Sequence, residues 1–424
     1  MSHPVAPTTA AAAAAPASDP RRMRMPRAAA DALPRAGLRL ELHYISFSHY
    51  CARARWYLGA CGVPVDALHP LLPVQHLPHM VALLKRMRAP RCPPTASSRS
   101  PASTPALAAF DRGTGAPIFL LQDSELIGRW AALRAQVFLN DGGAAARRLY
   151  GQGATLSVEE EEEEEEDERA KDDAGGGGAE GGGGEAGRPR RQAFSVAVLT
   201  YEAKAAGGGG PPGLTTPADL ERRLSAVLGV EARRLVYFHL LPRVDHLARL
   251  FSRNPPTGPS SSSSPGGVVG ALGALWAQYV TCPLWALAAS LALPRLLNVN
   301  RDAVDTGALL LAAEFDFLDA LVEARGCLIK GASGGEGAEE ERVGAFLFGE
   351  GGPSAADISL AALGGIIAGD VGPGYGARLP LVAELPPGLR KAVRERFAGR
   401  PAARYALALW REHGAAAVAA SSKA

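Results

Sequence analysis

Ser48 and Cys51 are two residues near the amino end of this chain whose types and spacing could perform chemistry. They stand three residues apart, where the sequence pattern changes from alternation to helical spacing. A hydroxyl beside the unpaired N–H groups of a helix N-terminus favours a thiolate over a thiol, because all of these groups donate hydrogen bonds. Ser48 is therefore a candidate for activating a bound thiol, and the alternative is a plain helix N-cap.

The elements that would position these residues alternate between strand and helix. Residues 38–45 alternate apolar and polar side chains, which predicts a strand, and residues 51–61 have one apolar face of helical spacing. Residues 118–121 predict a short buried strand. Asp123 and Ser124 are typical helix starters and precede a second helical pattern. The first part of the chain is therefore expected to be an α/β layer.

The second part of the chain predicts helices throughout. A Thr-Pro pair at 216–217 is typical of a helix start, and the pattern predicts that this helix ends at Gly229. Residues 304–322 show the spacing of a long amphipathic helix. Ser354 and Asp357 have the spacing of a capping box, in front of an apolar run that predicts a buried helix.

The order of these motifs resembles the glutathione transferase superfamily. The resemblance lies in the order and spacing of five stretches, which are Ser48-His49-Tyr50-Cys51, Ala116-Pro117, Gln122-Asp123-Ser124, Phe348-Gly349-Glu350 with Ser354-Ala355-Ala356-Asp357, and Arg400-Pro401-Ala402-Ala403-Arg404. It implies a thioredoxin-like α/β N-terminal domain, an all-helical C-terminal domain of the glutathione transferase type, and a glutathione site between them.

The resemblance also implies roles for individual residues. Glutathione would be the co-substrate, and Ser48 would stabilise its thiolate for attack on a small electrophile or a peroxide, as in detoxification. Ala116 and Pro117, joined by an expected cis bond, would pair with the cysteinyl backbone of glutathione. Asp123 and Ser124 would hold its γ-glutamyl end. Dimerisation is a further expectation from the family.

The chain departs from the family in one place. Two strands and a turn normally separate the proline from the Asp-Ser pair, whereas here only residues 118–122 intervene. This indicates either a deleted hairpin or a mis-joined segment, and it favours an alternative function as a non-catalytic binding or scaffold protein. A thiol oxidoreductase is another alternative. Cys51 occupies the second position of a thioredoxin-like redox pair, but the first position is serine, so a small buried hydrophobe is preferred.

Length and composition indicate two domains with low-complexity inserts. The chain has 424 residues, and 14 acidic residues stand against two basic residues between 159 and 185. The predicted boundaries are 1–37 for a disordered tail or transit peptide, 38–140 for the glutathione-binding domain, 141–213 for an acidic glycine-rich insert, 214–415 for the helical domain with a flexible insert at 254–267, and 416–424 for a tail.

Compartment and partners follow in part from the charges. The arginine-rich, acid-poor amino end predicts a plastid or mitochondrion if it is a transit peptide, and the cytoplasm otherwise. The net charge is +2, with arginines spread thinly and no basic run interleaved with aromatic residues, which argues against nucleic acid binding.

A membrane segment and a metal site are both disfavoured by the sequence. Residues 268–293 hold no charge and are long enough to cross a bilayer, but their glycines and Pro283 favour a buried helix pair. His76 and His79 could form a metal pair, yet Pro78 between them argues against a helix and no third ligand is nearby in the sequence. We therefore predict no metal.

Overall fold

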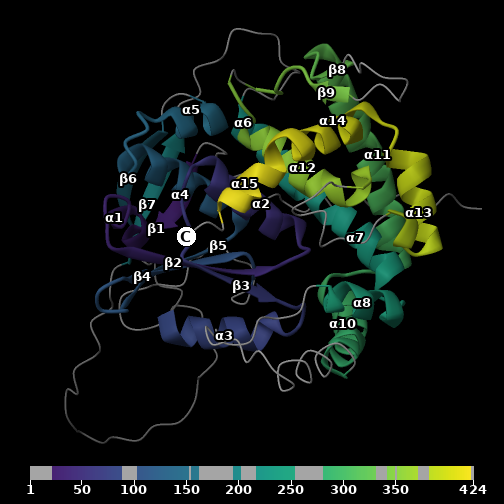
Figure 1. Cartoon of the computed structure of the whole chain (residues 1–424), viewed down its shortest axis with the longest axis horizontal. Coiled ribbons are helices and arrows are strands. Elements are labelled where there is room, and N and C mark those ends of the chain that lie inside the picture. The colour runs from purple at the N-terminus through teal and green to yellow at the C-terminus, as the bar shows by residue number, and fades with distance from the viewer. Residues whose placement is uncertain are drawn as a thin grey trace, which may run out of the picture.

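The computed structural model describes most of the chain. The described residues are 22–87, 103–151, 154–161, 194–201, 216–253, 280–330, 341–348, 351–370 and 382–421. They form a mixed α/β region at the amino end and a mostly helical region after it (Figure 1). Residues 162–193 and 202–213 of the predicted insert at 141–213, the predicted flexible insert at 254–267 and residues 1–21 lie outside the described residues.

A four-stranded mixed sheet forms the first region, with strand order β3-β2-β4-β5. Strands β2 and β3 are parallel, and β4 pairs antiparallel with both β2 and β5. The elements of this region are β2 (Leu38–Ile45), α2 (His49–Ala60), β3 (Ala67–Leu71), α3 (His76–Met87), β4 (Ala106–Asp111), β5 (Pro117–Gln122) and α4 (Ser124–Val137). The predicted strands at 38–45 and 118–121 and the helices that follow them are thus confirmed.

The two faces of this sheet are covered by different helices. Helices α2 and α4 pack against each other on one face, and α3 lies against the other, below the strands in Figure 1. The α3 face forms its own small apolar cluster, made by Met80, Leu83, Met87, Ala106, Ala108, Phe110 and Leu120. Alternate residues of β4 therefore point into two separate cores, which is why this strand is apolar throughout.

The hairpin that the sequence suggested was deleted is present. Strand β4 and strand β5 are joined by a turn in which Asp111 accepts hydrogen bonds from the backbone N–H groups of Gly113 and Thr114. The cis peptide bond precedes β4, between Thr104 and Pro105, and not between Ala116 and Pro117 as predicted. The predicted cis bond between Ala116 and Pro117 is therefore wrong.

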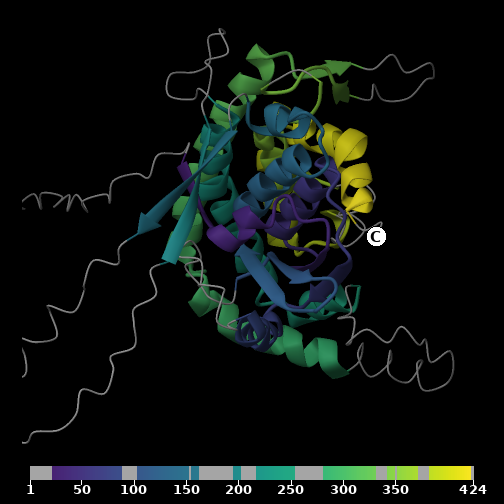
Figure 2. The same ribbon diagram turned by 90° about the vertical axis from the view of Figure 1, so that its left-hand side faces the viewer.

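A second sheet lies at the side of the molecule, and it corrects two predicted boundaries. Its antiparallel order is β1-β7-β6, formed by β1 (Arg22–Pro26), β7 (Phe194–Tyr201) and β6 (Ala154–Glu161) (Figure 2). Residues 22–37 were predicted as tail, but they contribute β1 and the short helix α1 (Arg27–Asp31), and bury Met25 and Leu33. Residues 144–150 form α5 within the predicted insert.

Within the described residues, the second region is built from helices and one small hairpin. Its helices are α6 (Pro217–Ala226), α7 (Leu228–Leu240), α8 (Val244–Ser252), α10 (Cys282–Leu296), α11 (Arg301–Ala324), α12 (Ala355–Ala368), α13 (Pro387–Ala392), α14 (Pro401–Leu409) and α15 (Ala415–Ala420). The hairpin is β8 (Leu328–Lys330) with β9 (Glu341–Val343), and single 3-10 or π turns occur at Val382–Glu384, Val393–Phe397 and Trp410–Gly414.

Helix α12 is the central element of this region. It is almost entirely buried and packs against α6, α7 and α14 as well as α2 of the first region. The predicted capping box is confirmed, since Ser354 accepts from the Asp357 N–H while the Asp357 carboxylate accepts from the Ser354 N–H. A second capping box, between Thr216 and Asp219, starts α6.

Three details of the helical region differ from the sequence expectations. Gly229 does not end α6 but lies inside α7, where a side chain would collide with the Tyr50 hydroxyl. Pro283 starts α10, and this helix is half exposed, with Leu284, Leu291 and Leu296 each more than 60% exposed. The predicted buried helix pair is therefore wrong for 282–296, and residues 268–279 lie outside the described residues.

The length and composition of the described helices can be compared with those of a membrane-spanning helix. None of them alone is long and apolar enough to cross a bilayer, although α10 and α11 would pass together as a pair bent by 75°. Helix α11 buries one of its faces against α7, whereas Leu309 and Leu310 are exposed.

The last helix ties the carboxyl end of the described chain to the first region. Helix α15, placed mostly within the predicted tail, packs against α2. Gly59 of α2 lies at this crossing, where a Cβ atom would be 1.8 Å from the Ala417 carbonyl oxygen. Because that oxygen belongs to the backbone, it cannot rotate away.

We therefore expect Gly59→Ala to lower the free energy of unfolding by about 1–3 kcal/mol, the usual cost of overpacking. Chemical denaturation of the purified chain measures this change. Gly37→Ala is the matched control, because a Cβ atom at Gly37 would meet no atom within 4 Å. Equal stability of the two variants would contradict the packing of α15 on α2.

Candidate functional site

A polar cleft of about 590 Å³ lies between the α/β region and the helical region. The α/β region contributes the residues before β4 and those at the start of α4, together with two side chains of α2. The helical region contributes side chains of α6 and α7. The lining residues are Tyr50, Arg53, Ser103, Thr104, Pro105, Asp123, Ser124, Glu125, Arg222, Ser225, Ala226, Val230 and Arg233. Three arginines and two carboxylates make this cleft suitable for a small zwitterionic ligand.

A smaller apolar pocket, of about 50 Å³, lies beside the cleft. Ser48 and Phe47, at the end of β2, form one wall, and the other walls come from α7, α8 and α10 through residues such as Tyr237, Leu250 and Leu293. Arg233 lines both cavities. The polar cleft and the apolar pocket are therefore neighbours that meet at one arginine.

Ser48 stands at the N-cap position of α2, as predicted, but its side chain does not cap the helix. Its backbone is extended, with φ −80° and ψ 126°, and its hydroxyl makes no capping hydrogen bond. His49, the next residue, is held in place because its Nε2 atom donates to the Gly229 carbonyl at 3.1 Å. Burial lowers the pKa of His49 to about 3, so this ring is neutral. The N-cap alternative for the Ser48 hydroxyl is thus not supported.

Cys51 is fully buried behind Ser48. Burial raises the pKa of the Cys51 thiol to about 11, even though hydrogen bonding with Ser48, with the backbone of Ile45 and with Thr104 acts in the opposite direction. The Ile45 N–H donates to the Cys51 sulfur at 3.3 Å. A protonated thiol without solvent access is a poor nucleophile, so Cys51 has the properties of a structural residue.

Asp123 and Ser124 lie in the cleft, but both already have partners. Asp123 accepts a hydrogen bond from the Glu125 N–H at 2.7 Å and so caps α4. Ser124 accepts two hydrogen bonds from Arg53, at 3.0 and 2.6 Å. Burial, and then the neighbouring Glu125, raise the pKa of Asp123.

Glu125 is held in its ionised form inside the cleft. Burial raises the pKa of Glu125, but Arg53 and Arg129 outweigh this effect and the net shift is downward. Arg53 lies 3.8 Å from Glu125 and also donates to Ser225 at 2.6 Å. Arg53 therefore connects the first turn of α4 with α6 across the cleft floor.

Ala116 and Pro117 do not belong to this site. Both lie at the turn end of the hairpin, and the Ala116 backbone is already engaged. Its N–H donates to the Thr114 hydroxyl at 3.2 Å, and its carbonyl accepts from the Asp111 N–H at 2.8 Å. Ala116 therefore has no free backbone group with which to bind a peptide. The residues that take the predicted place beside Asp123 are Thr104 and Pro105.

Sequence reasoning missed most residues of the cleft, among them Thr104, Pro105, Arg53 and Arg233. Thr104 and Pro105 carry no clear local signal, because the alanine-rich strand that follows them has a weak strand pattern. Arg53 lies off the apolar face that the sequence pattern of α2 indicates, yet it is only 1% exposed. Arg233 carries no local signal, since only the packing of α7 against the α/β region brings it to the cleft.

Beneath the cleft, a buried ion pair and a tyrosine join α4, α6 and α2. Arg129 and Glu221 are fully buried, and the closest nitrogen and oxygen are 3.7 Å apart. The Tyr57 hydroxyl donates to the other Glu221 oxygen, and it also lies within hydrogen-bonding distance of Ala355 and Ser359. Burial and the nearby Glu125 raise the pKa of Glu221 to about 7, despite the two arginines near it.

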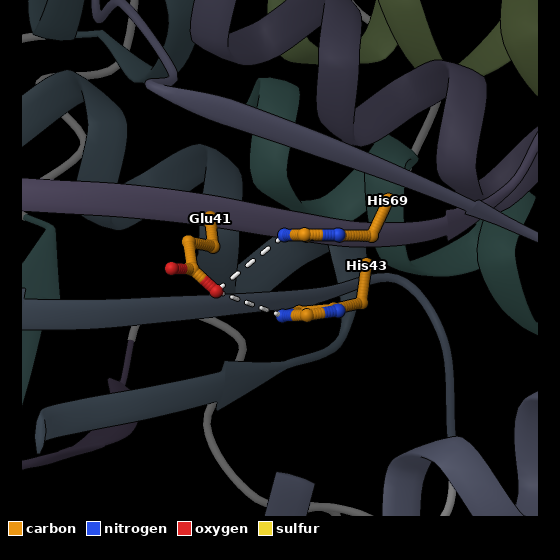
Figure 3. A group of neighbouring side chains, drawn as sticks. All are labelled: Glu41, His43 and His69. Atoms are coloured by element: carbon orange, nitrogen blue, oxygen red, sulfur yellow. Dashed lines mark ion pairs between the residues drawn. The ribbon is translucent and has the colours of Figure 1, made fainter. Parts of the chain in front are cut away.

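A histidine cluster lies on the opposite face of the sheet, under α3. His43 on β2 and His69 on β3 stack with ring centroids 4.5 Å apart, and each directs its Nε2 atom at the same Glu41 oxygen (Figure 3). His79 joins this cluster through a 2.9 Å hydrogen bond to His43.

The expectation that Pro78 prevents a helix is wrong, because α3 begins at His76 and its first turn needs no N–H at this position. The expectation that His79 lacks neighbouring ligands is wrong as well.

Comparison with known proteins assigns no relative to this chain. No family model matches it, and neither a curated protein nor a solved structure matches it significantly. A small mixed α/β sheet followed by a helical region is what the structure establishes, and any functional assignment depends on the geometry of the site.

Proposed function

We propose that this chain binds glutathione in the polar cleft and acts as an enzyme of the glutathione transferase type. The observation that supports the proposal best is the meeting of two cavities of different character at Arg233, with Ser48 on the wall of the apolar one. A transferase needs such a pair, because glutathione is a charged peptide and its usual electrophilic partners are apolar. The strand and helix order of the α/β region, β2-α2-β3-α3-β4-β5-α4, is compatible with a thioredoxin-like domain and so supports the proposal.

The charges of the cleft suit the three charged groups of glutathione. Arg222 and Arg233 face the cleft from α6 and α7, where guanidinium groups would pair with the two carboxylates of the peptide. Asp123 would receive the amine of the γ-glutamyl end. Thr104, at the start of β4, would pair through its backbone with the cysteinyl residue, as an added strand does.

Ser48 would act on the glutathione sulfur. A hydroxyl that donates to a thiolate stabilises the charged form, and each unit of pKa lowering corresponds to about 1.4 kcal/mol. The sulfur would then attack the electrophilic carbon of a substrate in the apolar pocket, forming a carbon–sulfur bond as the leaving group departs with its electron pair. The pocket holds only a few atoms as it stands, so α8 and α10 would move outward to admit a larger substrate.

A non-catalytic binding protein is the second candidate, and one observation favours it. Ser124 and Arg53 are hydrogen-bonded to each other, so two polar groups of the cleft are already satisfied within the protein. A ligand that needed them would have to replace these bonds. In this candidate function the cleft would bind a peptide or metabolite without activating a thiol.

Replacing Ser48 by alanine distinguishes the two candidates. If Ser48 stabilises the thiolate, the pKa of bound glutathione should lie well below the free value of about 8.5 in the unmodified chain and about one unit higher in Ser48→Ala. Ultraviolet absorbance of the thiolate, followed against pH, measures both values. Cys51→Ala is the control and should titrate like the unmodified chain, since the Cys51 thiol is protonated and buried. Binding with an unshifted sulfur pKa would support the non-catalytic candidate.

A further inference from the structure

Three potential metal ligands converge between the sheet and α3, on the face away from the proposed glutathione cleft. The Glu41 Oε2 atom lies 3.8 Å from His43 Nε2 and 3.5 Å from His69 Nε2. Sheet geometry fixes this arrangement. Glu41 and His43 are two residues apart on β2 and so share a face, and His43 is directly opposite His69 in the parallel pairing with β3.

The two ring nitrogens that face Glu41 lack hydrogen bonds. His43 Nε2 and His69 Nε2 are both buried atoms without a hydrogen-bond partner in the described part of the chain, and the His43 residue is only 2% exposed. A buried polar atom without a partner is unfavourable, and such atoms commonly mark the place of a missing ligand. Here the unpartnered nitrogens point at a carboxylate oxygen that also faces the same space (Figure 3).

A second histidine interaction orients His43 for coordination. Its other ring nitrogen, Nδ1, is hydrogen-bonded to His79 Nε2 at 2.9 Å, which fixes the ring and leaves Nε2 available. Histidines that bind metals usually make such a second hydrogen bond. The remaining oxygen of the carboxylate is also engaged, because Glu41 Oε1 pairs with Arg39 at 3.1 Å. His43 and Glu41 are therefore each oriented by a second interaction.

An ion pair between Glu41 and a protonated histidine is the simpler explanation of the cluster. Two features argue against it. Arg39 and Arg86 already supply positive charge to Glu41. In addition, the two Nε2 atoms lie 3.8 and 3.5 Å from the Glu41 oxygen, which is longer than the roughly 2.7–2.9 Å of a charge-assisted hydrogen bond. Two imidazole nitrogens and one carboxylate oxygen that lie within 4.8 Å of one another are an arrangement that suits a metal ion.

We propose that Glu41, His43 and His69 bind one Zn²⁺ ion. Ligand atoms in a tetrahedral zinc site with bonds of about 2.0–2.1 Å lie roughly 3.3 Å apart, so the two distances to Glu41 need to shorten by only a few tenths of an ångström. The three ligand atoms all lie within 4.8 Å of one another, and the stacked rings would tilt together to close on the ion. Imidazole with carboxylate suits zinc better than calcium or magnesium.

The fourth position of the ion would be taken by water. The His69 side chain is 35% exposed, so the site opens towards solvent on the β3 side. An ion bound by residues of β2 and β3 would stabilise the packing of the edge strand β3 against β2. Through the hydrogen bond between His43 and His79, it would also stabilise the position of α3. The proposal is independent of the glutathione cleft, because the two sites lie on opposite faces of the sheet.

Metal binding by the full-length chain tests this proposal. The purified chain, stripped with a chelator and dialysed, is titrated with Zn²⁺ alone by calorimetry, and with Co²⁺ by visible absorbance. We expect one tight site per chain, an intense tetrahedral Co²⁺ spectrum, and a rise in melting temperature with Zn²⁺. Octahedral oxygen sites on the acidic run at 159–168 would give only a weak Co²⁺ spectrum.

Variants assign the site to these residues. Glu41→Gln and His69→Asn should each weaken Zn²⁺ binding by at least about 100-fold, and His79→Gln by about 10–100-fold. His246→Asn, which removes a half-buried histidine on α8, should bind zinc like the unmodified chain. Glu41→Gln is nearly isosteric, and circular dichroism shows whether it folds. Absence of a tight site in the unmodified chain, or equal affinity in Glu41→Gln, His69→Asn and His246→Asn, would overturn the proposal.

Discussion

Asp357→Ala should lower the free energy of unfolding by about 3–5 kcal/mol. The Asp357 carboxylate is fully buried and accepts four hydrogen bonds. Its donors are the Leu347 N–H at 3.0 Å, the Ser354 N–H at 2.8 Å, the Ser354 hydroxyl at 2.6 Å and the Tyr405 hydroxyl at 2.7 Å. Alanine would leave these donors unsatisfied in the centre of the helical region. Urea denaturation followed by circular dichroism measures the loss.

The second capping box of the chain provides the matched control. Asp219 occupies the same position in α6 but is only half-buried, so water can replace the lost acceptor. We expect Asp219→Ala to cost about 1 kcal/mol, the usual effect of removing a cap. If Asp357→Ala lowers the free energy of unfolding as little as Asp219→Ala does, the four buried hydrogen bonds of the Asp357 carboxylate do not stabilise the fold as proposed.

The stability of the chain should depend on the protonation of Glu221. The pKa of Glu221 is about 7 in the folded protein, against 4.5 for an ordinary glutamate, so the folded state keeps a proton that the unfolded state loses. This tighter proton binding stabilises the folded state. Its contribution to the free energy of unfolding is complete below pH 4.5 and is lost as the pH rises through 7. The shift corresponds to about 3 kcal/mol.

Glu221→Gln isolates this effect from other titrating groups. Glutamine keeps the hydrogen bond from Tyr57 but cannot ionise, so the variant should gain about 3 kcal/mol relative to the unmodified chain between about pH 4.5 and pH 8. Denaturation curves of both proteins at several pH values give this difference. A constant difference across the range would mean that Glu221 is already ionised at low pH in the folded protein, with Arg129 as its full counter-ion.

The sequence predicted those elements whose own residues show a clear strand, helix or capping pattern. The alternation over 38–45 and the helical spacing after Ser48 placed β2 and α2 correctly, and the box at Ser354 placed the start of α12. In each case the signal lies within one element. It is either the set of side chains that share a face or the side-chain oxygen that caps a backbone N–H.

Strand β4 shows why Ala116 and Pro117 were wrongly predicted to belong to the glutathione site. Three of its first four residues are alanine, which has a low intrinsic preference for strands, so no strand pattern is visible. The segment is a strand because β2 and β5 lie on either side of it and helices cover both faces. Without β4, the only proline before a visible strand was Pro117, and the family resemblance was attached to it.

The histidine cluster was missed for a similar reason. Glu41 and His43 could be assigned to one face of a strand from the sequence alone. Their third partner depends on the parallel register of β2 with β3, and His79 depends on α3 crossing that face. Neither pairing can be deduced from spacing along the chain.

Calorimetric titration with glutathione tests the central claim most directly. We predict that the full chain binds one equivalent of glutathione, that Arg233→Ala weakens binding by about tenfold or more through loss of a charge-assisted hydrogen bond, and that Arg249→Ala, on the exposed side of α8, leaves it unchanged. If the unmodified chain takes up no glutathione, or if both arginine variants bind it equally well, the polar cleft is not a glutathione site.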